Sequence, residues 1–152
     1  MKYRNIPTLA VATLLLAFPV RSQEKGFGVG VIMGEPTGVS AKGWLSSRSA
    51  IDAGLAWSFR GSGYIHAHMD YLWHFHDIAA TTDQVMPYIG IGGRITGLRS
   101  AATAGVRVAG GLSWLPGGAP LDVFIELVPI VDLVPETRLS SNGGIGARFY
   151  FR

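Results

Sequence analysis

The chain has 152 residues, the length of a single domain. Hydrophobic residues make up 48% of it and charged residues only 15%, which is a low charge content for a soluble domain. There is no cysteine, so disulfides and lipid attachment through cysteine are excluded. The 21 glycines and 8 prolines disfavour long helices, so the composition favours strands.

The N-terminal segment has the features of an export signal. Lys2 and Arg4 precede the apolar run IPTLAVATLLLAFPV, and Ser22 is small enough to lie at a cleavage point. We therefore predict a signal peptide at residues 1–22 and one domain at residues 23–152. The alternative, a membrane anchor helix, is disfavoured because the run is short and contains two prolines.

Removal of the signal changes the charge balance. It takes away three of the 13 basic residues and leaves ten basic and ten acidic residues. This balance gives no support for a nucleic-acid partner, and we expect none. The rest of the chain has no apolar stretch near the roughly 20 residues that a helical span needs.

Alternation with a period of two predicts eight strands. In chain order they are GFGVGVIMG (26–34), GVSAKGWLS (38–46), SAIDAGLAWSF (49–59), GYIHAHMDYLWH (63–74), MPYIGIGGRITG (86–97), TAGVRVAGGLSWL (103–115), PLDVFIELVPIVDL (120–133) and NGGIGARFYF (142–151). Turn signals such as EPTG, RGSG and PGGAP separate them. Strands of this length can cross a bilayer when they are tilted.

The two faces of these strands differ sharply. One face collects large apolar side chains and carries no charge, as in Phe27, Val29, Val31 and Met33 of the first strand. The other face carries glycines and ten polar residues that we predict to form one network: Lys42, Asp52, His66, His68, Asp70, Arg94, Arg107, Asp122, Glu126 and Arg148.

The size of the apolar face decides which face points outward. The interior of an eight-stranded barrel is just wide enough for its own side chains, and the apolar set would overpack it. We therefore predict an eight-stranded antiparallel up-and-down transmembrane β-barrel, apolar outside, with a polar and glycine-rich lumen. The alternative is a soluble barrel in which the apolar face forms a ligand pocket.

Two further patterns favour the membrane barrel. Aromatic residues fall near the strand ends, where an aromatic belt is expected: Trp57, Phe59, Trp73, Phe75 and Trp114. The final GIGARFYFR resembles the C-terminal assembly signal of bacterial outer-membrane barrels, which implies the barrel-assembly machinery as a partner. It departs from that signal in Arg152, which follows the last Phe, and in Gly144, where a polar residue is usual.

Nearly the whole mature chain resembles a family of small, uncharacterised bacterial outer-membrane β-barrel proteins. The stretches that carry this resemblance are GEPTGVSAKGWL, AIDAGLAWSF, HMDYLWHF, YIGIGGRI, GVRVAGGLSWL, PLDVFIELVPIVDLVP and NGGIGARFYF. The resemblance implies the fold and a location in the bacterial cell outer membrane. That family has no established activity, so no functional residues are carried over.

The stretch YIHAHMDYLWHFHD, residues 64–77, contains all four histidines. Alternation places His66, His68 and Asp70 on the inward face, and the interpretation that we favour is a network of hydrogen bonds and ion pairs. We expect His66 and His68 to face the glycines of the last strand across a narrow lumen. We expect His74 to lie in a solvated loop with His76 and Asp77.

Two other interpretations of this stretch remain open. His66, His68 and Asp70 could hold a metal ion, although their spacing gives loose geometry. One of the two histidines with Asp70 could also supply the base and its orienting group in a lipid-modifying enzyme, with Ser58 or Ser62 as nucleophile.

These patterns lead to an expected function. A barrel this narrow is not a general pore, so we expect a plugged lumen and a structural or envelope-maintaining role, without enzymatic activity, cofactor or metal. We expect a monomer whose partners are outer-membrane lipid and the assembly machinery. The alternatives are an outer-membrane lipid A acylase or deacylase and a barrel that binds a small lipid.

Overall fold

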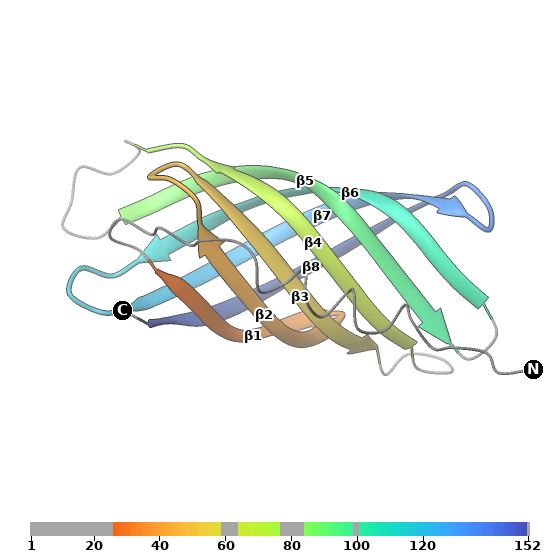
Figure 1. The fold of residues 1–152 in the computed structure, drawn as a ribbon, viewed down its shortest axis with the longest axis horizontal. Helices are drawn as coiled ribbons and strands as arrows, with labels where there is room; N and C mark the ends of the chain where they lie inside the picture. The colour runs from red at the N-terminus through yellow and green to blue at the C-terminus, as the bar shows by residue number, and fades with distance from the viewer. Residues whose placement is uncertain (1–25, 59–63, 77–83, 99–100, 152) are drawn as a thin grey trace, which may run out of the picture.

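The computed structural model describes residues 26–58, 64–76, 84–98 and 101–151, and Figure 1 shows that they form a barrel of tilted strands. The eight strands are β1 (Phe27–Glu35), β2 (Thr37–Trp44), β3 (Ser49–Ser58), β4 (Tyr64–His74), β5 (Gln84–Leu98), β6 (Ala101–Leu115), β7 (Leu121–Val134) and β8 (Arg138–Phe151). Each strand pairs antiparallel with the next, and β8 pairs with β1, so the sheet is closed. The predicted up-and-down barrel is confirmed, whereas the predicted signal peptide lies outside the described residues.

Most strand boundaries agree with the sequence within two residues, but β8 begins at Arg138, four residues earlier than predicted. Its first residues pair with the end of β7, from Asp132 opposite Arg138 to Val128 opposite Asn142. The stretch RLSS has one large apolar side chain, so alternation alone gave no signal there.

The two halves of the barrel wall differ in length. The strands β5 to β8 have 14 or 15 residues, whereas β1 to β4 have 8 to 11. We call the end that holds Phe27 and Phe151 the terminal end, and the end that holds Glu35 and Arg138 the far end. The longer strands reach further at the far end (Figure 1).

Inward and outward side chains alternate along every described strand. On β4, Ile65, Met69 and Trp73 are 44–62% exposed, whereas the neighbouring His66 and His74 are at most 1% exposed. Of the predicted aromatic belt, Trp57, Trp73, Phe75 and Trp114 lie on the exposed face, and Phe59 is outside the described residues. The apolar face therefore points outward, as predicted.

The described part of the chain contains no helix long and apolar enough to cross a membrane.

The interior is not entirely polar. A cluster of buried apolar and aromatic residues lies inside the barrel: Trp44, Ala50, Leu72, Met86, Tyr88, Ala109, Val128, Ile130 and Tyr150. Inward glycines make room for such large groups, because a Cβ at Gly146 would collide with the ring of Phe124. Large inward side chains thus lie over glycines of neighbouring strands.

Candidate functional site in the barrel interior

All ten residues predicted to form the polar network lie in the interior, with side chains or whole residues no more than 8% exposed. Alternation brings them there because each strand points every second residue inward. The register places several side by side, with Lys42 opposite Asp52 and Asp122 opposite Arg148. Their contacts form two groups, one toward each end of the barrel.

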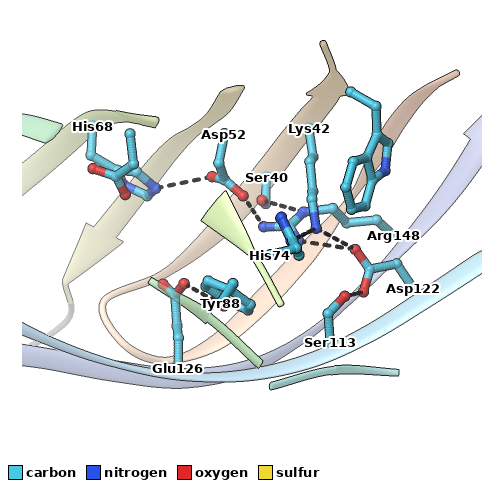
Figure 2. A network of polar contacts seen from close by, with 12 residues as sticks. Ser40, Lys42, Asp52, His68, His74, Tyr88, Ser113, Asp122, Glu126 and Arg148 are labelled. Atoms are coloured by element: carbon cyan, nitrogen blue, oxygen red, sulfur yellow. Dashed lines mark hydrogen bonds and ion pairs between the residues drawn. The ribbon is translucent and has the colours of Figure 1, made fainter. Parts of the chain in front are cut away.

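The group nearer the terminal end is centred on Asp122 (Figure 2). This carboxylate accepts hydrogen bonds from Lys42 Nζ at 3.2 Å and from Arg148 Nη1 at 3.4 Å. The hydroxyls of Ser113 and Tyr150 also donate to it. Four donors therefore converge on one buried anion, which compensates its desolvation.

Arg148 connects this group to the middle of the barrel. Its Nη2 pairs with Asp52, its Nε donates to the Ser40 hydroxyl at 2.9 Å, and its guanidinium lies 3.7 Å from the centre of the Phe124 ring. The fork of the guanidinium suits several acceptors at once. Arg148 thereby joins β8 to β2, β3 and β7 across the interior.

His74 belongs to this group, which contradicts the prediction of a solvated loop. It is the last residue of β4 and fully buried, with Nε2 at 2.9 Å from Lys42 Nζ. Its ring lies between Trp44 and Tyr88, at 4.4 and 5.2 Å. The even numbering of the inward residues of β4 extends to position 74, because the strand continues to that point. His76 is half-buried, and Asp77 lies outside the described residues.

The second group lies toward the far end. Arg107 pairs with Asp70 at 3.0 Å and with Glu126 at 3.6 Å, and Tyr88 donates to the same Glu126. Arg94 donates two hydrogen bonds to Asp132, at 2.9 and 2.6 Å, and a third to Ser140. These bonds hold β5 against β7 and β8.

The sequence reasoning missed Asp132. It is a fifth inward carboxylate and the partner of Arg94, which was expected to pair within the set of ten. Alternation from Asp122 and Glu126 along β7 reaches position 132, so the pattern could have identified it. Among the described residues, the buried charged side chains of the interior are therefore four Lys or Arg and five carboxylates.

We expected His66 and His68 to face the glycines of β8, but they do not cover them. A Cβ at Gly144 would meet Ile32, and one at Gly146 would meet Phe124. His68 instead folds over Gly54 of the adjacent strand, with Nε2 at 3.6 Å from Asp52 Oδ1. His66 Nε2 lies 3.4 Å from Arg107 Nη1. The rings thus pair with neighbours on their own side of the barrel.

The same geometry bears on the two alternative interpretations of the histidines. In the described ranges, no group of three His, Asp or Glu side chains is arranged to hold a metal ion. Asp70, the expected orienting group for a catalytic histidine, is paired with Arg107. The side chain of Ser58 and all of Ser62 lie outside what the structure describes.

The far end of the interior is hollow. A cavity of about 580 Å³ is lined there by Glu35, Tyr64, Arg94, Thr96, Gly97, Thr103, Asp132, Arg138, Ser140, Ser141 and Asn142. We call it the vestibule. A much smaller chamber of about 10 Å³ shares Glu35 and Asn142 with the vestibule and is also lined by His66, His68, Arg107 and Glu126.

An apolar outward face around a charged interior defines an outer-membrane-type β-barrel. No family model and no curated protein matches the chain. Among solved structures, it is similar to the N-terminal β-barrel domain of Pseudomonas aeruginosa OprF, with a TM-score of 0.70 and 13% sequence identity. The match covers 86% of this chain and 100% of that domain. At this identity the likeness concerns the fold.

Proposed function

We propose that this protein is a monomeric barrel of the bacterial outer membrane, with a lumen closed to diffusion and a structural, envelope-maintaining role. The observation that carries this proposal is the layer around Asp122 and Arg148, which joins strands on opposite sides of the lumen. Large buried residues such as Trp44, Leu72 and Met86 pack beside it. Such a filled cross-section leaves no route for a solute of ordinary size.

The membrane location is supported by the outward apolar face and by the likeness to an outer-membrane barrel domain. We propose that both termini lie on the periplasmic side. Phe149 and Phe151 point outward at the end of β8, with ring centres 5.5 Å apart, and would be available to the assembly machinery. Membrane lipid would cover the rest of that face.

A closed barrel can be tested by its gel mobility. The mature chain, refolded in detergent, should migrate faster without boiling than after it, and the protein should be found in the outer-membrane fraction of cells. A soluble species with no mobility shift would overturn the membrane assignment.

The closed lumen has its own test, in planar lipid bilayers. We expect no stable channel from the wild-type protein. The proposal fails if the wild type conducts steadily while its gel mobility shows an intact barrel.

The proposal includes no catalytic step. Asp70 pairs with Arg107 through Oδ2, and its Oδ1 makes no hydrogen bond to His66 or His68. Replacing His66 or Ser58 with Ala should leave the acyl composition of lipid A unchanged in cells that produce the variant. A changed composition would instead favour the lipid-modifying enzyme.

A further inference from the structure

The vestibule at the far end is lined by groups that suit a ligand rather than a packed core. Its volume of about 580 Å³ falls within the roughly 300–1,000 Å³ that is usual for small-molecule sites. Most such sites are apolar, whereas most of the residues that line this one carry a hydroxyl, an amide or a charge. The chemistry of these groups therefore indicates which ligand would fit.

The charges of the vestibule are balanced. Arg94 is committed to Asp132 by two hydrogen bonds and to Ser140 by a third at 2.8 Å. Glu35 and Arg138 add one charge of each sign. A phosphate or a carboxylate would find no surplus of positive charge, and a cation would find no surplus of negative charge. An uncharged ligand suits this lining best.

The neutral groups of the vestibule are mostly hydroxyls. Thr96 and Thr103 lie opposite each other in register, and Ser140 lies on the inward face of β8. A hydroxyl both donates and accepts, so this wall is complementary to a ligand with many hydroxyls of its own. Tyr64 adds an aromatic ring to the same cavity.

The chamber next to the vestibule holds buried polar groups without a partner. His66 is 1% exposed, and its Nδ1 has no hydrogen-bond partner. A guanidinium can only donate, so His66 Nε2 accepts from Arg107 and Nδ1 carries the proton. The Nδ2 of Asn142, which lines both cavities, is a second unsatisfied donor.

Unsatisfied buried donors cost free energy, and an oxygen placed within reach would recover it. The chamber has room for about one water, which could bridge His66 to a ligand above. Asn142 also lines the vestibule, so a rotation of its side chain would bring the buried Nδ2 to a ligand there. The floor of the cavity thus holds donors that lack an acceptor, and the hydroxyls of its walls can both donate and accept.

We propose that the vestibule binds a neutral, polyhydroxylated ligand, namely one or two sugar units. The saccharide lies against Tyr64, with its hydroxyls on Thr96, Thr103 and Asn142. The sugar can be free, or it can be the headgroup of a neutral glycolipid.

The first experiment is an NMR titration of the refolded, isotope-labelled barrel in a zwitterionic detergent without a sugar headgroup. The probe is N,N′-diacetylchitobiose, with inorganic phosphate as the charged comparison. We expect saturable shifts at the amides of Thr96, Thr103 and Asn142, and none at Ser113 near the terminal end. A stronger response to phosphate would overturn the proposal, and so would the absence of a shift both with the disaccharide and with the glycolipid tested below.

Two variants that each introduce a tryptophan distinguish the effect of filling the vestibule from the effect of adding an indole elsewhere on β6. Thr103→Trp fills the cavity and should weaken disaccharide binding at least ten-fold. Ala102→Trp places the indole on the outward face one residue earlier on β6, where Ala102 is exposed, and should bind as the wild type does. Equal binding by both variants would contradict the proposed site.

A third variant covers the case in which Thr103→Trp does not fold. Asn142→Ala removes a donor that has no partner, so the gel mobility shift should be retained while binding weakens several-fold. Unchanged binding would remove Asn142 from the site and overturn the proposed pose.

The source of the sugar is distinguished by a second titration, in nanodiscs with and without a neutral glycolipid. Shifts at Thr96 and Thr103 that require the glycolipid identify a membrane headgroup, whereas shifts with the free disaccharide alone identify a soluble saccharide. Absence of both responses would overturn the proposal.

Discussion

The two ends of the barrel interior differ in how completely side chains occupy the space inside the sheet. Toward the terminal end, Trp44, Leu72 and Met86 are at most 2% exposed and pack around a carboxylate with four donors. Toward the far end, hydroxyls and paired charges surround a cavity of about 580 Å³. One end is filled by the chain itself, and the other leaves space.

Strand length and side-chain volume together explain this difference. At the far end the long strands β5 to β8 supply nine of the eleven residues that line the vestibule, and β1 and β4 supply one each. Their inward side chains there include Thr96, Thr103 and Ser140, which are too small to meet across the lumen. A fixed number of strands thus sets the diameter of a barrel, whereas the size of the inward side chains decides whether a cavity remains inside it.

The largest effect is expected from the filled end. Asp122→Ala removes the shared acceptor of Lys42 and Arg148 and leaves buried positive charge without its partner. We expect a loss of about 3–5 kcal/mol in the free energy of unfolding. Urea unfolding in lipid vesicles, followed by tryptophan fluorescence and gel mobility, measures it. A loss below 1 kcal/mol would show that the Asp122 group does not stabilise the terminal end.

The packing of the His68 ring over Gly54, between the two ends, can be tested by a double substitution. A Cβ at Gly54 would lie 2.8 Å from Nε2 of His68, so Gly54→Ala should overpack the lumen and cost about 1–3 kcal/mol. Adding His68→Ala should recover most of this loss, because the three atoms nearest the new methyl belong to that ring. A double-mutant cycle measures the coupling. Additive losses would mean that the ring is not what Gly54 accommodates.

The matched substitution at the hollow end should cost less. Asp132→Ala removes the partner of Arg94, but water in the vestibule can solvate the guanidinium that remains. We expect about 1–2 kcal/mol, measured as for Asp122→Ala. If Asp132→Ala destabilised the barrel as much as Asp122→Ala does, the proposed contrast between a filled and a solvated end would fail.

The smallest effect is expected from Asn142→Ala, which removes a side chain whose Nδ2 has no partner. The free energy of unfolding should change by less than about 0.5 kcal/mol. The same urea titration checks it, with Asp132→Ala as the comparison at the same end. A loss comparable to that variant would show that Asn142 has a structural role.

Much of the fold could be predicted from the sequence, but much less of the pairing could. Alternation placed Lys42, Asp122 and Arg148 on the inward face, and the structure has them there. It did not indicate that Arg94 reaches Asp132, or that Asp122 collects four donors. A pattern of period two specifies which face a residue occupies, but not which side chain it meets across the lumen.

The errors at His74 and at the start of β8 have different causes. His74 is the last residue of the predicted strand at 63–74, and alternation in WHFH places it on the inward face, so the prediction of a solvated loop disregarded the pattern. At the start of β8 the strand continues past the last clear apolar alternation, in RLSS. Pairing with a neighbouring strand extends the ladder there, as Asp132 and Arg138 show. Local sequence carries little information about a partner that is distant in the chain.

By itself, the sequence determined the eight strands, the outward apolar face and the set of residues that line the interior, because these follow from local alternation and from the cost of exposing charge to lipid. Only the tertiary structure decided which charges pair, and that one end is closely packed while the other holds a cavity. Closure of the barrel fixes the stagger of the strands, and that stagger sets which side chains meet across the lumen.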